Sequence, residues 1–253
     1  MLYRTAVGAV GFLAVVAGSL SARAEPHHHW SYSGETGPSH WAELDQKNAA
    51  CGTGKSQSPI DIRTRESHRK DLPALVFDYR PTPIHIIDNG HSIQVDVQPG
   101  SSLRIGDKTY QLVQFHFHHP SEERIDGKSS EMVAHLVHRD SAGRLAVVAV
   151  LLNAGKPNAT VESLWSHLPK QKNHEMDFES VRIDPARLLP ADHSYFTYTG
   201  SLTTPPCSEG VRWFVLKLPS TLSKSEIAKF AGRYPNDARP LQKSNGREVL
   251  ATK

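Results

Sequence analysis

The sequence predicts a mainly β domain, a β-rich α+β fold with short surface helices. Apolar and polar residues alternate over several short segments, as they do in strands with one buried face. The 17 prolines and 17 glycines are spread along the chain and divide it into many short pieces. Helix signals, by contrast, occur at only two places.

Residues 1–24 have the features of a secretory signal peptide. Arg4 gives a positively charged start, residues 6–20 form an apolar run, and residues 22–24 (ARA) fit a cleavage site. The run is short for a membrane-spanning helix, which needs about 20 apolar residues, and an uncleaved anchor is the alternative. We expect cleavage to leave residues 25–253 as a single domain.

The charge of the chain is nearly balanced. Removal of residues 1–24 takes away Arg4 and Arg23 and no acidic residue, so the formal net charge falls from +3 to +1. Such a chain has no strong field for nucleic acid or an acidic membrane. We therefore expect neither as a partner once the signal peptide is removed.

Six segments are predicted to be strands: residues 93–97, 102–105, 110–118, 132–138, 145–152 and 211–216. Residues 145–152 (LAVVAVLL) are apolar on both faces, which is typical of a central buried strand. Asp126 and Gly127 form a turn signal between the third and fourth of these strands.

Two segments are predicted to be helical. Ser223 and Glu226 have the spacing of a capping box, and Ile227 and Phe230 follow them with helical periodicity. A second short helix is expected at residues 161–168.

A histidine pair marks one face of the third strand. Side chains alternate along a strand, so Gln114, His116 and His118 share one face, while the other carries Val113, Phe115 and Phe117. Two rises of about 3.3 Å separate the two histidines by roughly 7 Å at Cα. Two imidazoles at this spacing can reach one ion.

A third histidine lies on the next predicted strand, where His135 stands between Val133 and Val137 on one face. If the two strands pair, three imidazoles converge, and three histidines without a fourth protein ligand are typical of a catalytic zinc. The alternative is that these are ordinary polar strand residues, since the chain holds 15 histidines.

Short motifs along the chain resemble those of the α-class carbonic anhydrases and occur in the family's order. They are residues 29–32 (HWSY), 37–41 (GPSHW), 57–61 (QSPID), 89–91 (NGH), 114–118 (QFHFH), 120–122 (PSE), 135–138 (HLVH), 200–206 (GSLTTPP), Trp213 and 239–240 (RP). The resemblance covers nearly all of residues 25–253. It implies a central, twisted, mostly antiparallel sheet with the metal in a conical cleft.

The resemblance also implies an activity, the reversible hydration of CO₂ to bicarbonate and a proton by zinc-bound hydroxide. It assigns His116, His118 and His135 to Zn²⁺, Thr203 and Glu122 to orienting the hydroxide, and His91 to carrying the proton away. Further matches are Tyr32, Asn89 and Gln94 in the water network, Gln114 beside His116, Thr204 at bicarbonate, and an apolar wall for CO₂ made of Val137, Val147, Leu202, Val211 and Trp213.

Two positions depart from the family pattern. Many members have a glutamate two residues before the third histidine, where this chain has Val133, and a histidine where it has Glu123. Valine cannot accept a hydrogen bond, so the outer nitrogen of His135 must use a backbone carbonyl, a water or another side chain.

The same resemblance implies a disulfide between Cys51 and Cys207, the only two cysteines, and a homodimer, as in many bacterial relatives. The signal peptide indicates the periplasm of a Gram-negative bacterium, with other secreted locations as the alternative. Two free buried thiols are the alternative to the disulfide. Two alternatives to carbonic anhydrase activity on the same fold are a catalytically silent binding protein and a zinc-dependent esterase. All three zinc histidines are present and no ester pocket is evident, so we expect ester hydrolysis only as a weak side activity.

Overall fold

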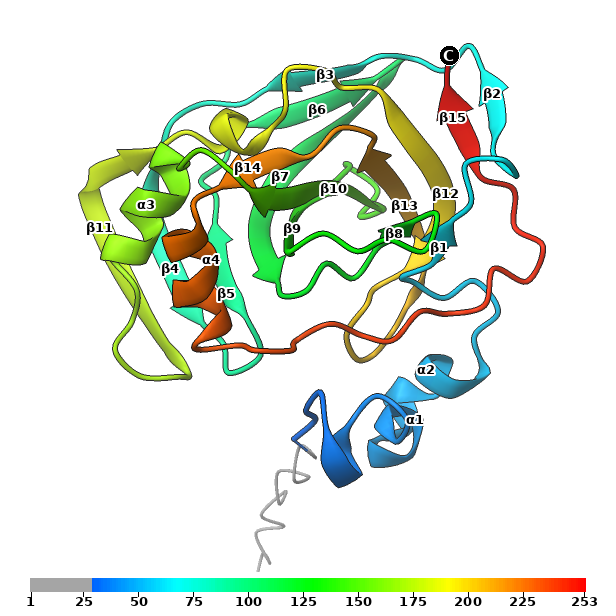
Figure 1. The fold of residues 1–253 in the computed structure, drawn as a ribbon, viewed down its shortest axis with the longest axis horizontal. Coiled ribbons are helices and arrows are strands. Elements are labelled where there is room, and N and C mark those ends of the chain that lie inside the picture. The colour runs from blue at the N-terminus through cyan, green and yellow to red at the C-terminus, as the bar shows by residue number, and fades with distance from the viewer. Residues whose placement is uncertain (1–28) are drawn as a thin grey trace, which may run out of the picture.

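The computed structural model describes residues 29–253, so the predicted signal peptide and residues 25–28 lie outside this range. One large sheet dominates the molecule (Figure 1). Its strands are β2 (His68–Lys70), β3 (Leu75–Asp78), β4 (Thr82–Asp88), β5 (Ile93–Asp96), β6 (Ser102–Ile105), β7 (Lys108–His118), β9 (Met132–Arg139), β10 (Leu145–Ala154), β11 (His174–Ile183), β12 (Tyr195–Ser201), β13 (Glu209–Leu216), β14 (Ser220–Leu222) and β15 (Leu250–Thr252). The predicted β-rich class is confirmed.

The sheet runs in the order β11-β4-β5-β7-β9-β10-β13-β12-β15-β2, with β14 beside β10 and with β6 linking β3 to β7. Three of its pairs are parallel, β10 with β13, β10 with β14, and β15 with β2, and the others are antiparallel. A separate two-stranded parallel sheet joins β1 (Asp61–Ile62) to β8 (Arg124–Ile125).

The predicted central strand is confirmed. β10 lies between β9 and β13, and its residues are buried from Ala146 to Leu152. Alternate side chains of β7, β9 and β10 point into two apolar clusters, one on each face of the sheet. The first contains Phe115, Phe117, Leu136 and Val148, and the second contains Val133, Val137, Val147 and Trp213.

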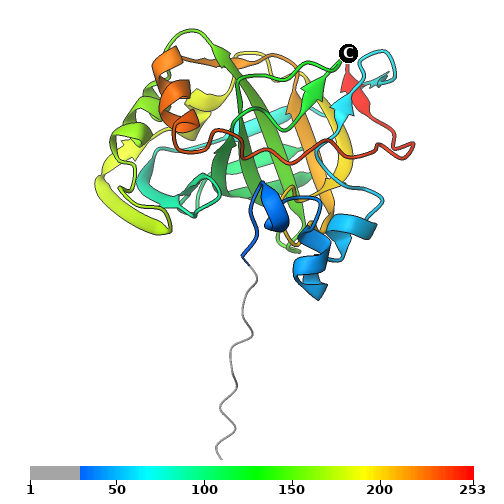
Figure 2. The same ribbon diagram turned by 60° about the horizontal axis from the view of Figure 1, so that its bottom comes forward.

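Within residues 29–253, four α-helices accompany the sheet: α1 (Trp41–Leu44), α2 (Ala50–Thr53), α3 (Ala159–Ser166) and α4 (Lys224–Ala231). The helices α3 and α4 lie together at the upper left of Figure 2, whereas α1 and α2 lie apart from them at the bottom of that view. Ile227 and Phe230 of α4 pack into the first cluster, and the capping box of Ser223 and Glu226 is present. No helix in the described range is long and apolar enough to cross a membrane.

Three long strands were not predicted, for separate reasons. β11 has almost only exposed side chains, and its apolar alternation is confined to two short pairs, Met176 with Phe178 and Val181 with Ile183. β4 contains Pro83, and a proline argues against a strand in the interior of a sheet. β12 is rich in threonine and tyrosine and is buried on both faces, so its sequence shows neither an apolar run nor an alternation of apolar and polar residues. The predicted strand at 93–97 ends one residue early, at Asp96.

Candidate metal centre

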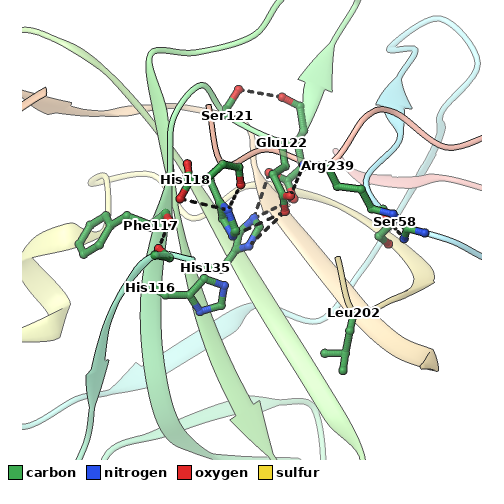
Figure 3. Close-up of polar contacts among 12 residues, drawn as sticks. Ser58, His116, Phe117, His118, Ser121, Glu122, His135, Leu202 and Arg239 are labelled. Atoms are coloured by element: carbon green, nitrogen blue, oxygen red, sulfur yellow. Dashed lines mark hydrogen bonds and ion pairs between the residues drawn. The ribbon is translucent and has the colours of Figure 1, made fainter. Parts of the chain in front are cut away.

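The pairing of β7 with β9 brings the three histidines together. In the antiparallel register His116 stands opposite His135, and His118 stands opposite Val133. The period of two puts all three imidazoles on the same face of the sheet, away from Phe115 and Phe117. Figure 3 shows His118 and His135 side by side and His116 next to them.

The rings converge closely. One nitrogen from each lies within 4.8 Å of the others, and within residues 29–253 this is the only such group of three or more potential ligands. The ring centroids are 5.0 Å apart for His116 and His118, and 4.9 Å apart for His118 and His135. His118 and His135 are almost fully buried. The three nitrogens are therefore close enough together to coordinate a single cation.

The outward nitrogen of each ring faces an acceptor. His116 Nδ1 lies 2.8 Å from Gln114 Oε1, and His118 Nδ1 lies 2.7 Å from the carbonyl oxygen of Asp237. His135 Nε2 lies 3.0 Å from Glu123 Oε1. This arrangement leaves Nε2 of His116, Nε2 of His118 and Nδ1 of His135 for a metal, the usual division between the inner and outer nitrogens of metal-bound histidines.

Two buried polar atoms at the site that make no hydrogen bond within residues 29–253 are also consistent with a bound metal. His118 Nε2 and Glu122 Oε2 are buried and have no hydrogen-bond partner among the described residues. Such orphaned polar atoms are costly unless another group satisfies them. A Zn²⁺ ion bound to three neutral imidazoles would occupy His118 Nε2, so the residues present fit zinc.

Burial and neighbouring charges set the titration of the rings. Burial, with His118 and His135 adding to it, holds the pKa of His116 well below its usual value, so this ring is neutral, as a ligand must be. Burial also lowers the pKa of His118, but Glu122 and Asp237 outweigh it and raise the pKa overall. Burial raises the pKa of Asp237 to about 7. These carboxyl groups favour a cation in the centre.

Glu122 is held from the side opposite to the histidines. Its Oε1 accepts a hydrogen bond of 2.7 Å from the backbone N–H of Arg239. Its Oε2 lies 3.7 Å from His118 Nε2 and 3.8 Å from His135 Nδ1. Thr203 is buried in the loop after β12, and no hydrogen bond joins it to Glu122 in the described structure. The expected contact between these two residues stays a prediction.

The residues expected to form the apolar wall gather beside the histidines. Val147 stands opposite Val137 on one side and Trp213 on the other, in one row across β9, β10 and β13. Trp213 also packs against His135, with 4.9 Å between the ring centroids. Val211 belongs to the same cluster, and Leu202 packs against it.

His91 lies apart from this cluster, on the turn between β4 and β5. Asn89 Oδ1 accepts from the backbone N–H groups of His91 and Ser92 and so fixes the turn. Together with His29 and Trp30, His91 lines a surface hollow of about 430 Å³. Burial, then His29 and Lys172, lowers the pKa of His91 to about 4.

Of the other residues expected in a water network, Gln94 donates from Nε2 to Asp96 Oδ1 at 2.7 Å. The Tyr32 hydroxyl is buried and has no hydrogen-bond partner among the described residues. Burial, followed by Glu122, raises the pKa of Tyr32 well above its usual value, so the hydroxyl keeps its proton.

The predicted disulfide is confirmed, since Cys51 of α2 is bonded to Cys207 in the loop that follows Thr203 and Thr204. Sequence reasoning missed the functions of three other buried residues. Glu123 faces His135, Asp237 supplies the acceptor for His118, and Arg239 holds Glu122. Asp237 and Arg239 lie far along the chain from the residues they contact, and Glu123 reaches His135 only through the path of its loop, so periodicity gave no sign of these contacts. Residues 239–240 were nevertheless among the motifs.

Comparisons with known proteins agree with this geometry. A sequence model described as eukaryotic-type carbonic anhydrase matches residues 36–253. A carbonic anhydrase of Nostoc sp. is 44% identical over 225 residues, which are 88% of this chain and 85% of that protein. One from Neisseria gonorrhoeae is 39% identical over 96% of this chain and 95% of its own length.

Solved structures give the same result. The α-carbonic anhydrase of Thermovibrio ammonificans, in complex with the inhibitor sulfanilamide, superposes with a TM-score of 0.85 at 39% identity and covers 88% of this chain and 99% of its own. The Photobacterium profundum α-carbonic anhydrase gives a TM-score of 0.82 at 41% identity, with coverage of 88% and 100%. The chain therefore belongs to the eukaryotic-type, or α-class, carbonic anhydrase family, and it is a carbonic anhydrase whose histidine triad is typical of the zinc site of that family.

Proposed function

We propose that the enzyme hydrates CO₂ reversibly to bicarbonate and a proton, with His116, His118 and His135 as the only protein ligands of one Zn²⁺. The observation that carries this assignment is the convergence of three ring nitrogens whose opposite nitrogens are all engaged by acceptors. Zinc supplies the nucleophile by lowering the pKa of a bound water to about 7, a value for which carbonic anhydrase is itself the reference case.

Glu122 and Thr203 are proposed to orient the attacking oxygen. An ionised carboxylate only accepts hydrogen bonds, so a threonine hydroxyl that faces it must donate to it. Thr203 Oγ1 is then left as the acceptor for the proton of the attacking oxygen. The anchoring of Glu122 by Arg239 supports this role, because it holds the free carboxylate oxygen beside the ligand nitrogens.

Val137, Val147, Leu202, Val211 and Trp213 are proposed to hold CO₂ against the metal. Carbon dioxide is apolar, and these side chains form one apolar cluster that reaches His135, with Leu202 partly exposed. Apolar walls also exclude the water that would compete for this position. Thr204, next to Thr203, is assigned to bicarbonate.

His91 is proposed to accept the proton released in the reaction and to pass it to solvent. An imidazole exchanges protons with water and buffer near neutral pH. Asn89 fixes the turn that carries His91, while Gln94 and the unpartnered hydroxyl of Tyr32 are proposed to hold connecting waters.

We further propose that residues 1–24 are removed during export to the periplasm. The Cys51–Cys207 bond supports this proposal, because disulfides persist in oxidising compartments. N-terminal sequencing of the periplasmic protein should begin at Glu25. The homodimer implied by the resemblance stays a prediction, which a sedimentation measurement would test.

A pH-indicator assay of CO₂ hydration with and without a zinc chelator tests the assignment. We expect one zinc per chain, and we expect both zinc and activity to be lost in His118→Ala. Full zinc occupancy and normal hydration in that variant would refute the ligand set. Zinc binding without CO₂ hydration in the unaltered protein would instead favour a silent module or, if esters are turned over rapidly, a dedicated esterase.

A further inference from the structure

Glu123 lies on the outer side of a zinc ligand. It follows Glu122 in the segment between β7 and β8, twelve residues before His135, and its side chain is fully buried. Both carboxylate oxygens approach His135 Nε2, at 3.0 Å and 3.2 Å. An acidic side chain in such a place needs a reason, because burial of a charge is costly unless the charge is paired.

The contact decides which nitrogen of His135 can bind metal. A carboxylate can only accept, so Nε2 carries the hydrogen and Nδ1 presents its lone pair. Nδ1 is the nitrogen that lies on the side of Glu122 Oε2, at 3.8 Å. The two consecutive glutamates therefore flank opposite nitrogens of one ring, with Glu123 on the outer side.

Hydrogen bonds from Ser121 and Ser130 fix the backbone around Glu123. Ser121 Oγ donates to the carbonyl oxygen of Glu123 at 2.9 Å, and the same Oγ accepts from the backbone N–H of Ser130 at 2.8 Å. Ser121 N–H in turn donates to the Ser130 carbonyl at 3.1 Å. The loop thus holds the carboxylate in a fixed position relative to β9.

The strand that carries His135 offers no substitute. Val133 lies two residues earlier on the same face of β9, is fully buried and belongs to the apolar cluster around Trp213. Its side chain has no acceptor. The carboxylate next to His135 therefore comes from the loop and not from the ligand's own strand.

We propose that Glu123 is the positioning residue that fixes the tautomer and ring orientation of His135, and thereby slows the release of zinc. This inference rests on the zinc site of the proposed function. The opposing explanation is that Glu123 and His135 form a buried ion pair that only stabilises the fold. The two explanations differ in what they predict for metal release.

The test measures the rate at which zinc passes from the purified holoenzyme to an excess of chromogenic chelator. In E123Q the shape of the side chain is kept but its charge is lost, and we expect release to be about 10-fold to 100-fold faster. The matched control is E226Q. Glu226 is also buried, but it caps α4 and accepts from Asn158 and Ser223, away from the three histidines. We expect E226Q to lower the melting temperature without changing the release rate.

The swap variant E123V/V133E keeps the same buried atoms and returns a carboxylate to the His135 face of β9. We expect it to release zinc nearly as slowly as the unaltered enzyme. The proposal is overturned if E123Q releases zinc at the original rate, or if the folded swap variant releases it as fast as E123Q. Failure of the proposed function would look different, because the unaltered enzyme would then bind no stoichiometric zinc or would keep it in His118→Ala.

Discussion

His91 lies flat against Trp30, with 3.6 Å between the ring centroids and 8° between the ring planes. The stack takes the imidazole partly out of water, and burial is the main reason that its pKa is lowered to about 4. A ring with a lowered pKa is a weak proton acceptor near neutral pH. We therefore expect His91 to accept a proton more readily when its ring is not stacked on Trp30.

Replacing Trp30 by alanine should raise the pKa of His91 toward about 6.5, because the ring regains contact with water. An NMR titration of the histidine ring protons measures this pKa directly. Trp30→Phe is the control, since a phenyl ring can keep the stack and the low pKa. An unchanged pKa in Trp30→Ala would mean that His29 and Lys172, and not the stack, lower it.

His91→Ala should lower kcat more than kcat/KM, because a proton carrier acts after the chemical step. We expect a loss in kcat on the order of 10-fold to 100-fold. Small imidazole buffers should restore much of it by bringing to the site an acceptor that titrates near neutral pH. A large loss in kcat/KM that no buffer reverses would show that His91 is structural.

Thr203→Ala, in contrast to His91→Ala, should mainly lower kcat/KM. Without the hydroxyl, the attacking oxygen loses its orientation during the chemical step, and kcat/KM should fall by about 100-fold. Thr203→Ser keeps the hydroxyl and should retain most of the activity. Stopped-flow CO₂ hydration measures both variants. Equal losses of kcat/KM in the alanine and serine variants would show that the Thr203 hydroxyl has no part in the mechanism.

Removal of the disulfide should weaken the fold. The bond between Cys51 and Cys207 spans 156 residues, and the chain-entropy model gives about 5 kcal/mol of stabilisation for a loop of this length. We expect the double variant C51S/C207S to melt well below the unaltered protein in calorimetry, and reduction of the unaltered protein to have a similar effect. Unchanged melting in both cases would mean that the loop entropy is offset elsewhere.

The zinc ligands were predictable because they obey a local rule. His116 and His118 alternate with Phe115 and Phe117 along a single strand, and that alternation survives in the fold. The contacts behind the ligands follow no such rule. The acceptor for His118 is the carbonyl of Asp237, 119 residues away, and the acceptor for His135 comes from a loop whose path is set by Ser121 and Ser130.

Val133, which replaces the glutamate of many family members, also shows that strand periodicity does not predict the contacts behind the ligands. The sequence indicates that Val133 cannot accept from His135, and it leaves a backbone carbonyl, a water or another side chain as alternatives. The structure selects the side chain of Glu123. The choice depends on how the segment after β7 folds back over β9, which is a tertiary contact that periodicity does not report.

Acid should destabilise the protein partly through His138, the histidine at the end of the 135–138 motif. His138 is fully buried, its Nε2 accepts from the Tyr79 hydroxyl at 2.7 Å, and burial lowers its pKa to about 4. The unfolded chain, with a pKa near 6.5, takes up a proton at a higher pH than the folded chain does. This contribution to stability is therefore complete above about pH 6.5 and is lost as the pH falls toward 4. The loss should amount to about 3 kcal/mol.

Urea unfolding between pH 7 and pH 4 measures this dependence. His138→Gln keeps a polar side chain but cannot take up the proton, so its free energy of unfolding should be lower at pH 7 and should fall less steeply with acid than that of the unaltered protein. The comparison is best made with the apoprotein, because protonation of the zinc ligands would otherwise add its own acid dependence. His68 is the control, since it lies exposed on β2, and its replacement by glutamine should leave the pH dependence unchanged. An identical slope in His138→Gln and the unaltered protein would show that His138 is not the group that titrates.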